Sequence, residues 1–200
     1  MAHLAIRLLG PFEVTLDGEP VTEFETRKTC ALLAYLAAEA DSAHRREALA
    51  EMLWPDRPEG AARANLRHTL RALRLAIGDY EAEPPFLITT REDISLNPDG
   101  DAWVDVGAFS ASQPRLARLE APDPEPLERA LALYRGAFLE DLSLPDSTLF
   151  EEWRILKREQ VQRQVLDLLS RLVAGYERRG EYERALAHAW RKVDLEPWDE

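Results

Sequence analysis

The stretch from Gly60 to Gly78 reads GAARANLRHTLRALRLAIG and contains four arginines and no acidic residue. The whole chain, by contrast, has 37 acidic and 25 basic side chains and a formal net charge of −12. The arginines are spaced four, four and three residues apart, so an α-helix gathers them along one side. An apolar stripe runs beside them at intervals of four, three and four, formed by Leu66, Leu70, Leu73 and Ile77. The stretch therefore predicts an amphipathic helix that docks on a core and offers guanidinium groups beside it.

The arginine row favours a nucleic-acid partner, because clustered guanidinium groups bind phosphates and guanine edges well. An ordinary solvated helix face is the alternative. Solvated faces usually mix acids with bases, however, and this face has no acid. The rest of the chain is acidic: residues 1–110 hold 11 basic and 19 acidic side chains, a net charge of −8. Any affinity for DNA must therefore come from a local patch, and it must depend strongly on salt.

Several classes of protein are excluded or disfavoured by missing patterns. No apolar run reaches the roughly 18 residues of a membrane span, and no signal peptide is visible, so we expect a cytoplasmic protein without a membrane partner. Cys30, the single cysteine, is expected to be a buried reduced thiol. We expect no enzyme, metal or cofactor, because the sequence lacks a P-loop and a GxGxxG motif. The histidines form no metal-ligand spacing with the cysteine: His3, His44, His68 and His188.

The residues before the arginine helix predict two short strands and two helices. LAIRLL (4–9) and FEVTL (12–16) are typical of strands on either side of a Gly-Pro turn. Thr26 is a suitable cap for a helix that continues to about Ala40. A second helix is predicted from Arg45 to Trp54.

The arginine helix has clear start and stop signals, and a hairpin follows it. Pro58 suits its first turn, and Gly78 suits its C-terminal end. PFLITT (85–90) and ISLN (94–97) predict a β-hairpin, with a possible third strand at residues 102–104.

The C-terminal half predicts helices. Composition shifts after Phe109, and APDPEP (121–126) is typical of a linker or of a helix start. Gly175 and Gly180 mark positions where the longest helix is expected to weaken and turn. The predicted helices span Leu127 to Arg135, Ser147 to Arg179 and Glu181 to Leu195.

Three helices followed by a hairpin is the order of a winged helix-turn-helix, and a preceding sheet narrows it to the OmpR type. The N-terminal half resembles the DNA-binding domain of the Streptomyces antibiotic regulatory protein family, in the stretches IRLLGPFEVTLDGEPV, RKTCALLAYLA, REALAEMLWPD and ARANLRHTLRALRLAIG. Residues 104–195 resemble the bacterial transcriptional activator domain that follows it in that family, in VDVGAF, ALALYRGAFLEDL and FEEWRILKREQV.

The resemblance implies a mainly α fold with a small β component. Residues 1–107 are expected to form an OmpR-type winged helix with a small N-terminal sheet, and residues 108–200 an all-helical, tetratricopeptide-like domain. The last residues resemble one tetratricopeptide repeat, which we expect to be unfinished at the C-terminus. Its matching positions are Leu172, Gly175, Tyr176, Gly180, Tyr182, Ala185 and Pro197.

The implied function is a sequence-specific transcription activator that binds direct repeats in double-stranded promoter DNA and recruits RNA polymerase. Self-association of protomers on those repeats is also implied. The alternative is a helical interaction scaffold or signalling adaptor whose winged helix does not bind DNA, and the net charge of −8 supports it.

The resemblance makes the arginine helix the recognition helix. Its N-terminal members, Arg63 to His68, are expected deepest in the major groove, and Arg71 and Arg74 at phosphates. Arg91 is expected at the tip of the wing. The candidate DNA contacts are Arg63, Asn65, Arg67, His68, Arg71, Arg74, Arg91, Arg27 and Lys28.

The loop WPDRPE (54–59) joins the second helix to the recognition helix. In OmpR-type activators this loop faces RNA polymerase, so Asp56, Arg57 and Glu59 are the implied polymerase contacts. Trp54 is expected to pack inward as part of the core.

Overall fold

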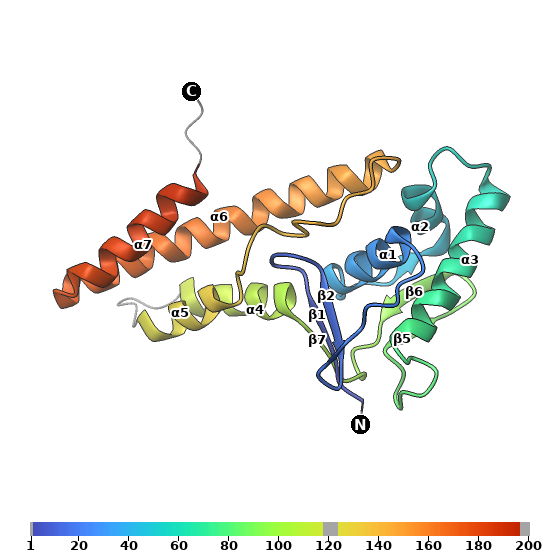
Figure 1. The fold of residues 1–200 in the computed structure, drawn as a ribbon, viewed down its shortest axis with the longest axis horizontal. Helices are drawn as coiled ribbons and strands as arrows, with labels where there is room; N and C mark the ends of the chain where they lie inside the picture. Colours follow the sequence, from blue (N-terminus) through green and yellow to red (C-terminus); the bar gives the residue numbers. More distant parts are fainter. Residues whose placement is uncertain (1, 118–123, 197–200) are drawn as a thin grey trace.

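The computed structural model describes residues 2–117 and 124–196. The N-terminal strands belong to a small mixed sheet that lies at the centre of the molecule (Figure 1). The strand order in this sheet is β3-β2-β1-β7, where the strands are β1 (Leu4–Arg7), β2 (Glu13–Leu16), β3 (Glu19–Pro20) and β7 (Ala102–Val104). β7 runs parallel to β1 and pairs Val104 with Ile6. The sheet therefore joins the two ends of the N-terminal half.

The residues that lie between β3 and β7 in the sequence form a winged helix-turn-helix. Its helices are α1 (Arg27–Ala38), α2 (Arg46–Leu53) and α3 (Glu59–Ala76). The wing is the antiparallel pair β5 (Leu87–Thr89) and β6 (Asp93–Leu96). A two-residue strand, β4 (His44–Arg45), pairs with the other edge of β6 and ties the start of α2 to the wing.

The other helices of the described chain lie after β7, so the expected mainly α fold with a small β component is confirmed. They are α4 (Asp105–Ala117), α5 (Pro124–Ala132), α6 (Thr148–Arg179) and α7 (Tyr182–Leu195). α6 and α7 form a hairpin, and the N-terminal end of α6 reaches back to α1 and α2 (Figure 1). α3 lies at the end of the molecule opposite the tip of that hairpin (Figure 1).

Local signals in the sequence explain the helix ends. Thr26 caps α1 by accepting the N–H of Thr29 at 3.2 Å, as expected. Gly78 follows α3 with a φ of 65°, a left-handed conformation that favours glycine, so it ends this helix as predicted. Gly180 ends α6 in the same way, with a φ of 71°.

Three features of the fold differ from the sequence-based expectation. Residues 102–104 pair with β1 rather than with the wing, and the strand that pairs with the wing is β4, at the free edge of β6. Helix α4 was not expected, and the expected domain boundary after residue 107 falls inside it. Gly175 lies buried within a continuous α6, where packing outweighs the roughly 1 kcal/mol cost of a helical glycine. Residues 121–123 of the expected linker, and Pro197, lie outside the described residues.

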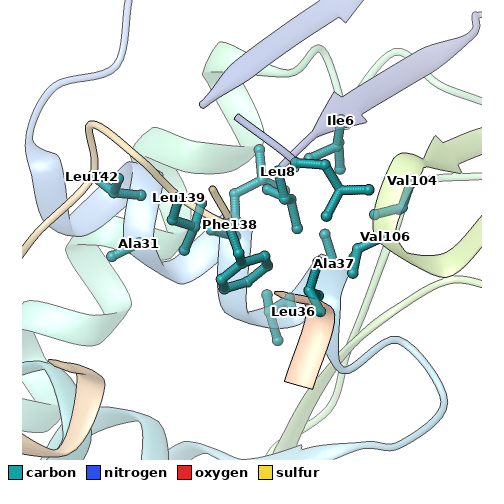
Figure 2. Close-up of a cluster of buried hydrophobic side chains, with 14 of the residues drawn as sticks. Ile6, Leu8, Ala31, Leu36, Ala37, Val104, Val106, Phe138, Leu139 and Leu142 are labelled. Atoms are coloured by element: carbon teal, nitrogen blue, oxygen red, sulfur yellow. The ribbon is translucent and has the colours of Figure 1, made fainter. Parts of the chain in front are cut away.

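A single apolar core joins the two halves (Figure 2). The labelled part of this core takes buried side chains from β1 and the residues after it, α1, β7, α4 and the segment before α6. Phe138 and Leu139 from that segment lie beside Leu8 and Leu36 in Figure 2. Phe138 also forms an isolated bridge with Leu9 and packs its ring against Trp153 with centroids 5.6 Å apart. The winged helix and the helical half therefore share one hydrophobic interior.

Polar contacts reinforce this junction. Trp153 of α6 packs at a tilt against Tyr35 of α1, with ring centroids 4.9 Å apart, and its Nε1 donates to Glu39 at 2.8 Å. The buried carboxylate of Asp105 accepts the backbone N–H groups of Leu8 and Leu9 at 2.8 and 2.9 Å. Burial raises the pKa of Asp105, and the N–H donors oppose that rise. The hydrogen bonds to Asp105 fix the end of β1 against the start of α4.

Candidate nucleic-acid interface

α3 has the two faces that its sequence predicts. Leu66, Leu70 and Leu73 are 1%, 6% and 0% exposed, so the apolar stripe is core. Arg63, Arg67 and Arg71 are exposed on the outer side. The packed stripe fixes the rotation of the helix and thereby turns these arginines to solvent.

The first half of α3 borders a hollow of about 660 Å³, which we call the arginine hollow. Three elements that are distant in sequence build it: the β4–α2 junction, α3 and the turn of the wing. Its lining residues are Arg45, Arg46, Glu47, Arg63, Leu66, Arg67, Arg91 and Glu92. The structure thus concentrates five guanidinium groups in one place on a strongly acidic protein.

Three arginines of the hollow are free to bind a ligand. Arg45, Arg67 and Arg91 are exposed and make no side-chain hydrogen bond or ion pair within the described parts of the chain. Arg91 lies at the tip of the wing, as expected, where the Thr90 hydroxyl accepts the N–H groups of Glu92 and Asp93. An unpaired guanidinium retains all five of its donors for an incoming acceptor.

Arg46 has a structural role in the same hollow. Its Nε donates to the Thr90 carbonyl at 2.9 Å, and its backbone N–H donates to the Glu92 carbonyl at 2.8 Å. Partial burial lowers its pKa from the ordinary arginine value. Sequence reasoning missed both Arg45 and Arg46. The adjacent pair before α2 was visible, but only the pairing of β4 with β6 brings it to the wing.

The other N-terminal candidates on α3 have different surroundings. Arg63 pairs through Nη2 with Glu47 at 2.6 Å and with Glu59 at 2.5 Å. His68 is exposed and contacts Glu25 at 3.1 Å, and Asn65 is half-buried. Of these three residues, only Arg63 lines the arginine hollow.

The two C-terminal candidates on α3, Arg71 and Arg74, differ in whether another residue of the chain binds them. Arg71 is exposed and makes no ion pair in the described residues. Arg74 is bound to the buried carboxylate of Asp79 at 2.6 Å and stacks on Tyr80, 4.1 Å from its centroid. Asp79 also accepts the N–H of Leu87 at 2.8 Å. Arg74 therefore fixes the wing to the recognition helix and is not placed to contact phosphate.

We expect Arg74→Ala to lower the free energy of unfolding by about 2 kcal/mol, because it leaves the buried charge of Asp79 without its partner. Urea unfolding followed by circular dichroism measures this. Arg71→Ala is the matched control and should change stability by less than about 0.5 kcal/mol. Equal stabilities for the two variants would contradict the structural role of Arg74.

Arg27 and Lys28 lie away from the arginine hollow and are bound to the helical half. Arg27 donates to the carbonyl groups of Asp141 and Ser143 at 2.7 and 3.2 Å. Lys28 pairs with Asp146 at 2.7 Å, and this lysine lowers the pKa of that carboxyl. Both cations are thus used at the junction between the two halves.

The loop between α2 and α3 presents two of the candidate polymerase contacts. Asp56 and Arg57 are exposed and form no side-chain contact among the residues that the structure describes. Glu59 is held by Arg63. Trp54 is half-buried against the core, with the Lys28 ammonium 5.3 Å from its ring centroid, so its expected inward packing is confirmed.

Residues 2–117 and 124–196 contain neither a metal-binding cluster nor a membrane-spanning helix. No group of three or more histidine, cysteine, aspartate or glutamate side chains there is arranged to hold a metal ion. None of the helices in these ranges is long and apolar enough to cross a membrane. Cys30 is half-buried, and burial raises the pKa of its thiol to about 11.

An arginine-lined recognition helix beside a wing, joined to helical hairpins, defines a winged-helix transcription regulator. Residues 23–93 match the family described as "Transcriptional regulatory protein, C terminal", and residues 104–200 match "Bacterial transcriptional activator domain". The chain belongs to the transcriptional activators of the Streptomyces antibiotic regulatory protein type, in which an OmpR-type winged helix precedes this helical domain.

Individual relatives agree with this assignment. The transcriptional regulatory protein EmbR of Mycobacterium bovis and of Mycobacterium tuberculosis is 30% identical over 146 residues, which is 70% of this chain and 37% of EmbR. The chain thus spans little more than a third of these relatives. A structure of M. tuberculosis EmbR in complex with a low affinity phosphopeptide has the same fold, with a TM-score of 0.66 and 23% identity. The match covers 97% of this chain and 60% of that one.

Proposed function

We propose that this chain activates transcription by binding direct repeats in promoter DNA and by contacting RNA polymerase. The observation that carries the proposal is the arginine hollow between α3 and the wing. In this proposal residues 1–107 bind DNA, and residues 108–200 form the helical activator domain. We propose no catalytic activity and no cofactor, and we place the protein in the cytoplasm.

The proposed DNA contacts lie on α3, at the wing and at the start of α2. We propose that α3 enters the major groove with Arg63, Asn65, Arg67 and His68 foremost, and that the wing brings Arg91 to the adjacent backbone. Arg71, one turn further along α3, then lies at phosphate level. Arg45 joins this surface. Arg74 is omitted because it is bound to the buried Asp79, and Arg27 and Lys28 are omitted because they are bound to the helical half.

The acidic surface around the hollow restricts binding to one orientation. A net charge of −8 in residues 1–110 repels phosphates everywhere except at the hollow. Each phosphate contact that a bound arginine makes should contribute about −0.9 to the slope of log K against log salt. A slope near zero would contradict a phosphate-led interface.

The direct test is a protection footprint on promoter fragments from the gene neighbourhood of the protein. Side-by-side protomers on direct repeats should protect two segments whose centres are about 10 base pairs, or a multiple of that, apart. A single protected segment would contradict binding to repeats. Failure to protect any fragment, with the chain shown to be folded, would contradict the DNA-binding proposal itself.

The α2–α3 loop is the proposed polymerase contact. Asp56→Ala should leave DNA affinity within about twofold of the wild type, because the side chain lies outside the arginine hollow. It should lower activated transcription severalfold, because an exposed charged contact to the polymerase is lost. Gel retardation and run-off transcription on the same promoter measure the two effects. Full activation by the variant would remove this loop from the polymerase interface.

A second candidate function is protein docking without DNA. It is supported by a row of exposed apolar side chains on α7, at 70%, 58% and 62% exposure for Tyr182, Leu186 and Trp190. A docking protein of this kind would retard no promoter fragment and would bind protein partners through α7. The footprint therefore separates the two functions.

A further inference from the structure

Arg63 differs from the other exposed arginines of α3 because two carboxylates hold it. Both contacts are made to one nitrogen, Nη2, which lies 2.6 Å from Glu47 Oε1 and 2.5 Å from Glu59 Oε1. Arg67 and Arg71 make no such contact within the described residues. The three side chains of this cluster carry a formal charge of −1 in total, so Arg63 adds nothing to the long-range attraction of DNA phosphates.

Two helices supply the carboxylates. Glu59 lies in the first turn of α3, four residues before Arg63, and Glu47 lies in the first turn of α2. The cluster is open to solvent: the side chains of Arg63, Glu47 and Glu59 are 48%, 65% and 76% exposed. Exposed pairs of this kind add little to folding stability. Arg63 and Glu47 both line the arginine hollow, and Glu59 holds the same Arg63 nitrogen, so the cluster lies where an incoming ligand would meet it.

The cluster distinguishes between the two kinds of acceptor that DNA offers. A phosphate is an anion, and it would lie within a few ångströms of two carboxylates, so like-charge repulsion opposes it. The O6 and N7 atoms of guanine are neutral acceptors and are not repelled in this way. The same arginine can therefore engage a guanine edge at a lower electrostatic cost than a phosphate.

We propose that Glu47 and Glu59 are specificity-determining residues, which hold Arg63 for a guanine edge and prevent it from binding phosphate. Arg71, which lacks a carboxylate partner within the described residues, supplies a sequence-independent phosphate contact. This inference rests on the proposed DNA-binding function.

The experiment compares Glu47→Gln and Arg63→Ala with the wild-type chain. Two DNA probes are used: the duplex that the wild type enriches from a random library, and poly(dA-dT), which contains no guanine edge, as non-specific DNA. Glutamine keeps the size of the side chain and its acceptor oxygen but removes the charge, so it separates electrostatic exclusion from simple positioning. Affinity is measured for both probes as a function of salt.

Glu47→Gln should bind poly(dA-dT) about threefold more tightly, which is the scale of one exposed ion pair. Its salt slope should become steeper by about 0.9 as Arg63 gains a phosphate contact. Its affinity for the enriched duplex should rise less, so the ratio of specific to non-specific binding falls. Arg63→Ala should lose about tenfold in preference at one G·C pair and leave binding to poly(dA-dT) nearly unchanged.

Glu51→Gln is the matched control. Glu51 is an exposed acid one turn further along α2 and has no ion pair among the described residues. If it changes the specificity ratio and the salt slope as much as Glu47→Gln does, net charge alone explains the effect and the inference is overturned. An unchanged ratio in Glu47→Gln also overturns it. A wild-type chain that enriches no duplex would instead refute the proposed function.

Discussion

The Arg67→Ala/Arg71→Ala variant is expected to lose the ability to retard a promoter fragment that the wild-type chain retards. Both side chains are exposed on the outer side of α3 and unpaired within the described residues, so their guanidinium groups are available to DNA. Each arginine contact is worth about 1–3 kcal/mol, so their joint removal should weaken binding by about a hundredfold or more. Gel retardation titrations measure the loss, and circular dichroism checks that the fold is unchanged.

A second double variant tests whether a change in net charge alone weakens DNA binding. Arg163→Ala/Arg178→Ala removes two exposed arginines from α6, a helix that lies away from α3 (Figure 1). It changes the net charge by the same amount and should retain wild-type retardation. Unchanged retardation in the α3 double variant would contradict the assignment of the recognition helix. Equal losses in both double variants would show that binding responds to net charge and not to α3.

Phe138→Ala is expected to destabilise the whole chain, by about 3–5 kcal/mol. Phe138 is fully buried where the winged helix and the helical half meet (Figure 2), and its ring also packs on Trp153. Its removal leaves a cavity between the two halves that neither half can close alone. In a chain of 200 residues this corresponds to a fall of about 10 °C in Tm.

Urea unfolding followed by far-ultraviolet circular dichroism and by tryptophan fluorescence tests this prediction. The two probes should report one coincident transition in both proteins, because the halves share a core. Tyr182→Ala is the control, since that aromatic side chain is 70% exposed. The free energy of unfolding of this variant should differ from that of the wild type by less than about 0.5 kcal/mol. Two separated transitions, with only one shifted by Phe138→Ala, would contradict a shared core.

The recognition helix could be read from the sequence because its signals are local. Leucine spacing fixes which face of α3 is buried, and that spacing places the arginines outside. Pro58 and Gly78 mark the two ends of the helix, and alternation in residues 85–97 predicts the wing. All of these signals act within one or two turns or strands, so neighbouring residues are sufficient to specify them.

Only the tertiary structure decided which arginines remain free to bind a ligand. Arg74 has the same spacing as its neighbours on α3, yet Asp79 beyond the helix end binds it. Arg27 is held by carbonyl groups more than a hundred residues away, and Arg45 reaches the hollow only through the pairing of β4 with the wing.

The sequence by itself thus determined the three helices of the winged helix-turn-helix, the wing, the buried stripe and the solvent-facing arginine row, because helix and strand periodicity depend on residues close in the chain. The folded chain determined that β7 joins β1, that both halves share a core, and which guanidinium groups remain unpaired. Ion pairs and strand pairings between distant residues carry no periodic signal. They depend on which surfaces meet after the core has packed.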